Sequence, residues 1–397
     1  MFLQALSEKI SLASKTVILR VDFNVPYHHN GEIGDDIRIT SSLPTIYHLL
    51  DKNCKVILIS HLGRPKGTYK ASDSLYAVFC RLKTILPSTY FSRDPIGSVE
   101  LETHIKSLQN RDVLLLENIR FYKEEEENDL GFSKLLSKMG DVYVNDAFGT
   151  CHRKHASTFG IVPFMEHTSL GFLIEKELHY LKQNLKRPLL AIIGGSKIST
   201  KIGVLTSLLD KVDKVFIGGA MVFTFLMARG FSVGNSLVEE DKVDIARQIE
   251  HLAIQKGVEL ILPIDFQVVK AIEQEETKEV VSFDNLEEWI GVDHGPHTSL
   301  LLEMKILENN FNILWNGPVG MFEVDAYADG TRKVFEILSK LPKETSVVLG
   351  GGDTLSAMKK FGFKPDDFTH ASTGGGVMLE LLEGKKLPVI EILQENK

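Results

Sequence analysis

Arginine, histidine and asparagine side chains follow the apolar runs in the first half of the sequence. They stand in four short segments, which read RVDFNVP, SHLGRP, LENIRF and NDAFGTCHR. A guanidinium group can hold a carboxylate or a phosphate through two parallel hydrogen bonds. In open α/β sheets, ligands bind beyond the carboxyl ends of the strands. The first half is therefore predicted to bind a small, highly anionic ligand.

Glycine takes the same place in the second half. The apolar runs there lead into GGSK, GGAM, WNGPVG, GGGDT and STGGG. Glycine lets a ligand come close to backbone N–H groups, and N–H groups at the start of a helix bind phosphate. We interpret the second half as the binding region for a larger, phosphate-bearing ligand. One chain would then hold two different anions on two lobes.

Seven side chains make up the candidate site of the first half. Asp22 and Asn24 share one face of a strand end, because side chains alternate along a strand, and they could bind hydroxyl and carboxylate groups. Each residue alone has a simpler explanation, such as turn capping or a surface charge. Together they favour a site, since random surface arginines should fall on helix faces at least as often as at strand ends. The set is Asp22, Asn24, Arg38, His61, Arg64, Arg120 and Arg153.

Two lysines, one aspartate and two glycines are the main candidates of the second half. Lys197 and Lys201 are four residues apart, so they should share a helix face near its N-terminus and could bind phosphate. Two solvated lysines are the simpler alternative. Asp353 could ligate Mg²⁺ on a nucleotide's phosphates, or cap a helix. Gly374 and Gly375 leave N–H groups open to an anion at another helix start.

The elements that position these residues alternate between short apolar runs and amphipathic segments. Repeated βα order predicts an α/β fold with two doubly wound, mostly parallel-sheet domains. The runs are nearly continuous in apolar residues, as strands buried on both faces require. A length of 397 residues also favours two domains. Residues 171–186 are predicted to form an interdomain helix and hinge between a domain of residues 1–170 and a domain of residues 187–382.

Composition narrows the class of protein. Hydrophobic content of 43% and charged content of 25% are ordinary for a globular protein, and a net charge of −8 argues against nucleic-acid binding. No apolar run approaches the roughly 20 residues of a membrane helix, and the N-terminus has no signal-peptide pattern. The 3 cysteines have no metal-binding spacing. We therefore expect a cytoplasmic protein, monomeric, without disulfides and without nucleic-acid or membrane partners.

In order along the chain, these segments resemble those of phosphoglycerate kinases, and the similarity covers essentially the whole length. It rests on VILRVDFNVP, DDIRI, SHLGRP, LLLENIRF, VNDAFGTCHR, GGSKISTKI, WNGPVGMFE, GGGDT and STGGG. The resemblance implies an N-terminal domain that holds 3-phosphoglycerate or 1,3-bisphosphoglycerate and a C-terminal domain that holds MgADP or MgATP. It also implies that the tail, from about residue 383 to residue 397, returns to the N-terminal domain.

The resemblance assigns a role to each candidate residue. The seven side chains of the first half would form the glycerate site, with Arg38 facing the transferred phosphoryl group. Lys201 and the N–H groups of Gly374 and Gly375 would surround the same group, and Asp353 would hold Mg²⁺. The nucleotide side would comprise Gly194, Lys197, Lys201, Gly218, Gly219, Asn316, Pro318, Glu323, Gly351, Gly352, Asp353 and Thr354.

Two other functions stay open at this point. A nicotinamide-dependent dehydrogenase would also have an α/β fold, but G-x-G-x-x-G is absent, as is the P-loop pattern. A non-catalytic nucleotide-binding protein could retain the fold, although Arg38, Lys201 and Asp353 argue against it. The chain departs from the family at His294 and His297, where an aliphatic residue and a lysine are expected.

Overall fold

A computed structural model describes residues 2–27, 31–183 and 186–395 of the chain. The chain divides into two compact units, one made of Met1–Leu178 with Lys386–Lys397 and the other of His179–Lys385. Two six-stranded sheets, one in each unit, are parallel throughout. They confirm the predicted α/β class with two mostly parallel sheets. None of the helices in the described part of the chain is both long and apolar enough to span a membrane.

The sheet of the first unit has the strand order β3-β4-β2-β1-β5-β6. Its strands are mostly buried aliphatic runs, as a sheet covered on both faces requires. The order reverses between β1 and β5, which is where such sheets bind ligands. The strands are β1 (Thr16–Arg20), β2 (Lys55–Ile59), β3 (Thr89–Ser92), β4 (Val113–Leu116), β5 (Val142–Asn145) and β6 (His167–Leu170).

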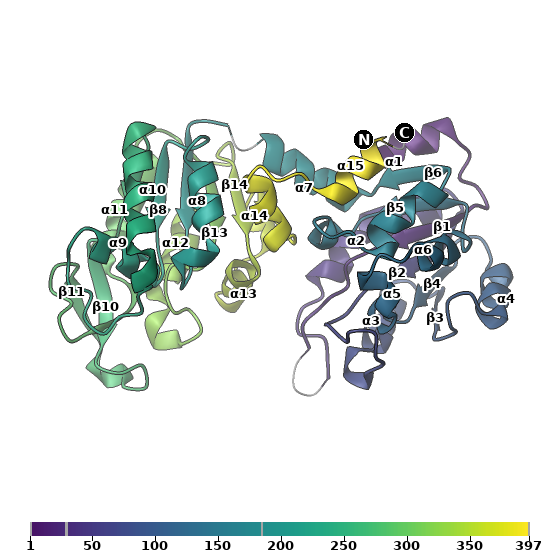
Figure 1. The fold of residues 1–397 in the computed structure, drawn as a ribbon, viewed down its shortest axis with the longest axis horizontal. Coiled ribbons are helices and arrows are strands. Elements are labelled where there is room, and N and C mark those ends of the chain that lie inside the picture. Colours follow the sequence, from purple (N-terminus) through teal and green to yellow (C-terminus); the bar gives the residue numbers. More distant parts are fainter. Residues whose placement is uncertain (1, 28–30, 184–185, 396–397) are drawn as a thin grey trace. The chain divides into compact units, whose positions relative to one another are not determined.

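Helices from both ends of the chain belong to the first unit, as Figure 1 shows for α1 and α15. Both pack against β6. The backbone N–H of Val389 in α15 donates to Cys151 O at 3.3 Å. The helices are α1 (Phe2–Lys9), α2 (Ile37–Asp51), α3 (Tyr76–Ile85), α4 (Val99–Ser107), α5 (Lys123–Glu126), α6 (Leu130–Ser137) and α15 (Pro388–Glu395).

The main sheet of the second unit has the order β15-β14-β13-β7-β8-β9, which reverses between β7 and β13. Its core includes Trp315, whose ring lies 4.3 Å from that of Phe335. The strands are β7 (Leu189–Ile193), β8 (Lys214–Ile217), β9 (Glu259–Ile261), β13 (Asn312–Asn316), β14 (Val347–Gly350) and β15 (His370–Ala371). The helices are α8 (Ile202–Leu208), α9 (Val222–Ala228), α10 (Val243–Gln255), α11 (Pro296–Leu307), α12 (Asp329–Leu338), α13 (Gly352–Lys360) and α14 (Gly376–Leu382).

A smaller antiparallel sheet of the second unit corrects the sequence interpretation. The run ELILPIDF reads as one strand, but β9 ends at Ile261 and β10 (Asp265–Val269) belongs to another sheet. Pro263 lies between them, and proline cannot donate to a strand ladder. In this second sheet β10 pairs with β11 (Glu279–Ser282) and with β12 (Ile290–His294).

Helix α7 (Phe172–Gln183) contains the point at which the chain passes from one unit to the other. The division falls between Leu178 and His179. Asn184 and Leu185, which the expected helix of residues 171–186 includes, lie outside the described residues. The role of α7 as a hinge stays a prediction.

Candidate functional site

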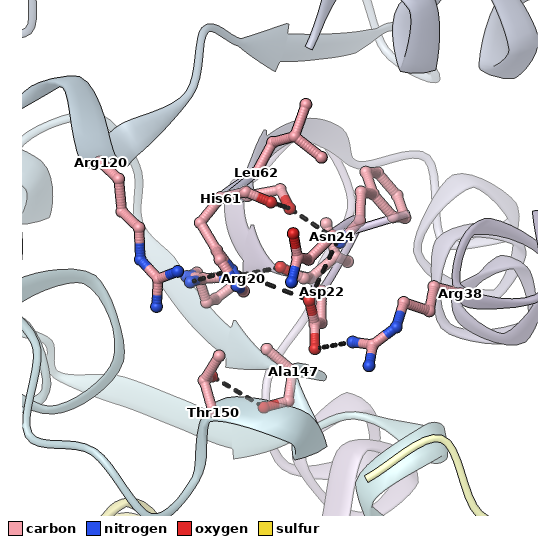
Figure 2. A network of polar contacts seen from close by, with 12 residues as sticks. Arg20, Asp22, Asn24, Arg38, His61, Leu62, Arg120, Ala147 and Thr150 are labelled. Carbon is pink, nitrogen blue, oxygen red and sulfur yellow. Dashed lines mark hydrogen bonds and ion pairs between the residues drawn. The ribbon is translucent and has the colours of Figure 1, made fainter. Parts of the chain in front are cut away.

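A network of charged side chains lies at the carboxyl ends of β1 and β2 in the first unit, and Figure 2 shows its members converging. Arg38, in the first turn of α2, donates from Nη1 to Asp22 Oδ2. Nδ1 of His61 lies 3.7 Å from Asp22 Oδ1. Asp22 also packs against backbone, because a Cβ on Gly149 would collide with its carboxylate. Asp22 therefore orients Arg38 and places a negative charge beside His61.

The surroundings of Asp22 and His61 fix their charges. Burial acts to raise the pKa of Asp22, but the positive charges of Arg38 and of its other neighbours outweigh burial and hold the pKa below its ordinary value. Burial lowers the pKa of His61 well below 6.5, and Asp22 opposes this only in part. Asp22 is thus ionised and His61 neutral near pH 7.

Arg120 brings hydrogen-bond donors that the described residues leave unused. Its side chain is 2% exposed, and Nη1 donates to Gly63 O at 2.7 Å. Nε lies 3.4 Å from Glu126 Oε1, yet neither Nε nor Nη2 has a hydrogen-bond partner among the described residues. Burial and the charge of Arg20 lower its pKa to about 10. A buried donor without an acceptor is costly, so an anion placed here would be stabilised.

The remaining side chains of the seven are placed less closely. Asn24 accepts the N–H of Gly63 at 2.9 Å, which ties it to the loop that also receives Arg120. Arg153 Nε lies 2.9 Å from His152 Nε2, and its charge contributes to the lowered pKa of Arg120. Arg64 is exposed and makes no hydrogen bond or ion pair within the described ranges. The structure thus connects all of the seven except Arg64 to the network or its edge.

Arg20 is a member of the network that the sequence analysis missed. It is fully buried at the end of β1, and its Nε donates to Ser157 Oγ at 2.8 Å. Its Nη2 lies 3.2 Å from His61 Nδ1. A guanidinium group only donates, so His61 Nδ1 accepts and neutral His61 carries its proton on Nε2. The signal was present in the sequence, since an arginine ends the apolar run TVILR.

A cavity of about 610 Å³ lies at the carboxyl ends of the central strands of the second unit. Its glycines allow backbone to pack on backbone. A Cβ on Gly194 would collide with the carbonyl oxygens of Gly317 and Pro318. Gly219 has φ +69°, and a Cβ there would meet the backbone of Gly195. Only glycine fits these turns, and their packing shapes the cavity wall.

Lys201 and Asp353 both line this cavity. Nζ of Lys201 donates to Asn316 Oδ1, while Asn316 Nδ2 is buried and has no hydrogen-bond partner in the described part of the chain. Burial lowers the pKa of Lys201, and the charge of Asp353 opposes that shift. A cation and a carboxylate thus face one cavity, as a complex of phosphate and metal would need.

Asp353 is not a helix cap, which was the simpler alternative for it. The N-cap of α13 is Gly351, so Asp353 lies in the first turn, where a carboxylate complements the helix dipole. Thr354 Oγ1 accepts the N–H of Gly317 at 2.8 Å and ties α13 to the turn after β13. The structure therefore fixes the start of this helix against the cavity wall.

The other predicted nucleotide residues divide between the cavity wall and its surroundings. The wall includes Gly194, Lys201, Gly219, Pro318, Glu323 and Asp353. It does not include Lys197, Gly218, Asn316, Gly351, Gly352, Thr354, Gly374 or Gly375. Sequence analysis also missed apolar members of the wall, among them Phe223, Leu237 and Met321, because nothing in the sequence separates them from core residues.

The expected shared helix face of Lys197 and Lys201 is wrong. A 3₁₀ turn, Ile198–Thr200, separates the two lysines, and α8 begins only at Ile202. Lys197 is exposed, whereas Lys201 is partly buried. The spacing of four residues carries no helical geometry here, because the chain does not yet follow an α-helix.

Comparison with known proteins settles the family. The family model described as phosphoglycerate kinase matches residues 7–385. The chain belongs to the phosphoglycerate kinase family. A phosphoglycerate kinase of Prochlorococcus marinus is 48% identical over 98% of this chain and 98% of its own length. One of Nostoc sp. is 46% identical over 97% and 96%.

Solved structures of phosphoglycerate kinases agree with the fold. That from Coxiella burnetii matches with a TM-score of 0.86 and 37% identity over 98% of each chain. That from Pyrococcus horikoshii matches with a TM-score of 0.83 and 29% identity, again over 98% of each chain. The function is that of a phosphoglycerate kinase, with ATP and ADP as co-substrates, and neither the dehydrogenase nor the non-catalytic alternative is favoured.

His294 lies in the wall of the second unit's cavity. It is 1% exposed, and its Nε2 lies 2.9 Å from Ser299 Oγ. Nδ1 lies 3.8 Å from Asp293 Oδ1 and makes no hydrogen bond within the described residues. Burial lowers the pKa of His294 to about 4 and raises that of Asp293 to about 8. His297 is exposed, and its Nδ1 lies within hydrogen-bond distance of Asp265 Oδ2, at 3.0 Å.

His294→Leu is expected to reduce the loss of stability in acid. The folded protein holds His294 neutral, while the unfolded chain binds a proton below pH 6.5, so stability falls as pH drops from 6.5 towards 4. The lowered pKa of His294 corresponds to a loss of folding free energy on the order of 3 kcal/mol at low pH. Thermal unfolding from pH 7 to pH 4.5 should therefore show a flatter decline in the variant. His251→Gln, at an exposed position of α10, is the control, and parallel curves for His294→Leu and wild type would contradict this role.

Proposed function

We propose that the chain catalyses the reversible, Mg²⁺-dependent transfer of the acyl phosphoryl group of 1,3-bisphosphoglycerate to ADP, giving 3-phosphoglycerate and ATP. The observation that carries the proposal is the contrast between the two sites. One gathers buried arginines with unused donors around Asp22, and the other is a glycine-walled cavity with Lys201 and Asp353 in its wall. Phosphoryl transfer depends on positioning and charge neutralisation, which these sites would supply.

In this proposal the first unit binds the glycerate ligand. The unused donors of Arg120 would hold its phosphate or carboxylate, and His61 would donate from Nε2. Arg38, oriented by Asp22, would face the transferred group and stabilise the charge that develops on it. Asn24, Arg64 and Arg153 would complete the site. No side chain becomes phosphorylated in this scheme.

The second unit would bind the nucleotide. Lys201, now hydrogen-bonded to Asn316, would turn to a phosphate oxygen when nucleotide is present. The N–H group of Gly375, before α14, would bind the same phosphates. The N–H group of Gly374, which the sequence analysis expects to be open, donates to Ser372 Oγ at 3.2 Å and would have to leave that hydrogen bond to join it. Gly194, Gly219 and the other turn glycines would frame the base and ribose, together with the apolar part of the wall.

Mg²⁺ would enter this site with the nucleotide. Among the described residues, no group of three His, Cys, Asp or Glu side chains is arranged to hold a metal ion. Mg²⁺ is usually bound by one or two carboxylates together with substrate phosphates, and Asp353 in the cavity wall fits that requirement. The ion would neutralise phosphate charge. Asp353 would hold the ion, and Lys201 would hold a phosphate oxygen.

A coupled assay tests the function directly. The protein is mixed with ATP, Mg²⁺ and 3-phosphoglycerate, and 1,3-bisphosphoglycerate is detected through its reduction by a coupling dehydrogenase and NADH. Activity that requires all three reactants is expected. Nucleotide binding without turnover would favour the non-catalytic alternative, and oxidation of NADH without the coupling enzyme would favour the dehydrogenase. We further propose that the protein is a cytoplasmic monomer. Gel filtration with light scattering would test whether it is monomeric.

The proposal also requires that the two units move. In-line transfer brings the reacting atoms to about 3 Å, and the acyl phosphate must be kept from water. We place the hinge at α7, within which the chain passes between the units. The radius of gyration is expected to fall mainly when 3-phosphoglycerate and MgATP are both present. Small-angle scattering of apo, binary and ternary samples measures it, and an unchanged radius in an active preparation would contradict the hinge.

A further inference from the structure

A second cavity in the second unit has no role in the proposed reaction. It has a volume of about 700 Å³ and is lined by residues of β10, β11, α11 and α12. Among the described residues, its lining shares one member with the nucleotide cavity, which is His294. The two cavities therefore share one buried side chain, that of His294, in their walls.

Gln267 lines this second cavity and has an acceptor that the described residues leave unused. It lies in the cavity lining and is 7% exposed, and its Oε1 has no hydrogen-bond partner among the described residues. The register of β10 against β12 shifts between Gln267 and Val268. Such bulges redirect side chains away from the regular strand pattern. A bound N–H donor would satisfy this buried oxygen.

The charges of the lining favour a cationic ligand. Each basic side chain already faces a carboxylate: Lys278 and Arg332 lie 3.7 and 3.6 Å from Asp329 oxygens, and Lys333 lies 3.4 Å from Glu336. By contrast, two acidic side chains of the lining have no ion pair within the described residues, namely Glu279 and Glu303. An anion would compete with carboxylates for every cation here, whereas an ammonium group would find two unpaired carboxylates.

Apolar side chains complete the lining. Val280 and Leu300 are 50% and 56% exposed, and both border the cavity. We propose that this cavity binds a small aliphatic amine, with ammonium N–H groups at Gln267 Oε1, Glu279 and Glu303 and the alkyl chain against Val280 and Leu300. Alkyl and ammonium parts match the two kinds of surface that the lining offers.

The amine site is coupled to the nucleotide site through His294. Nε2 of His294 is hydrogen-bonded to Ser299 Oγ, and Ser299 lines the amine cavity. Nδ1 on the other side of the ring faces Asp293, which lines the nucleotide cavity. A ligand that changes the hydrogen bond to Ser299 therefore changes the wall of the nucleotide cavity. This coupling rests on the proposed nucleotide site, and linkage requires that ADP changes amine affinity by the same factor.

Calorimetric titration of the full chain with 1,5-diaminopentane tests the site. Binding of one equivalent is expected, and 1,5-pentanediol, of the same length but uncharged, should bind at least about tenfold more weakly. Glu303→Gln and Gln267→Leu should each weaken diamine binding by about tenfold while leaving turnover unchanged. Glu344→Gln, an exposed substitution in the same unit that lines neither cavity, should have no effect.

Two results would overturn the site: no diamine binding at concentrations up to about 10 mM, or equal affinity in wild type, Glu303→Gln and Gln267→Leu. A saturating amount of diamine should also shift the Kd of ADP by at least about twofold. An unshifted Kd would refute the coupling. Failure of ADP to bind when no diamine is present would instead count against the proposed nucleotide site, so the two proposals fail separately.

Discussion

Replacing Arg38 by alanine is expected to lower kcat by about 100-fold or more and to leave the affinity for 3-phosphoglycerate within a few fold. The ion pair with Asp22 holds the guanidinium of Arg38 in one orientation before substrate binds. A donor group fixed in advance stabilises charge that appears only in the transition state. Steady-state kinetics, together with equilibrium binding of 3-phosphoglycerate, measures the two effects separately.

Two further variants make this prediction sharper. Arg38→Lys should not restore activity, because an ammonium group cannot reproduce the planar fork of donors. Arg81→Ala removes an exposed arginine of the same unit, which is paired with Asp36, and should change kcat little. A near-normal kcat with a large rise in KM for Arg38→Ala would mean that Arg38 anchors the ground state of the substrate.

The order of apolar runs was enough to predict the central strands but not the edges of the sheets. β1, β2, β4 and β5 are aliphatic, and their runs are plain in the sequence. The edge strands β3 and β6 read TYFS and HTSL, so their pairing depends on β4 and β5 rather than on their own composition. The small sheet of β10–β12 was missed for the same reason, since its strands are placed by tertiary contacts.

The candidate site divides in the same way. Asp22 and His61 could be predicted because parallel strands bring their carboxyl ends to one edge. Arg20 also ends its strand, so its position could be predicted, but its hydrogen-bond distance from His61 could not, because that contact depends on packing inside the sheet. Lys197 shows the opposite error, because a periodicity was applied to residues that do not form an α-helix. The direction of a side chain depends on tertiary packing, and the order of residues alone does not predict it.

Replacing Asp353 by asparagine is expected to weaken binding of MgADP by on the order of 100-fold, while metal-free ADP binds within about threefold of wild type or slightly better. The lost interaction is that between a carboxylate and a cation. Asp353 lies in the wall of the nucleotide cavity, close enough to Lys201 to affect its pKa. Without the metal, this carboxylate repels phosphate and partly offsets the positive charge of Lys201. Its removal should therefore not weaken binding of metal-free ADP.

Calorimetry with ADP in excess Mg²⁺ and in excess chelator measures both affinities for the same protein. Asp366→Asn is the matched control, because Asp366 is an exposed aspartate of the same unit and lies outside the cavity wall. It should leave both affinities unchanged. An equal loss of affinity in Asp353→Asn with and without Mg²⁺ would mean that Asp353 supports the start of α13 and does not bind the metal. The ratio of the two affinities therefore decides the role, whatever the variant does to overall stability.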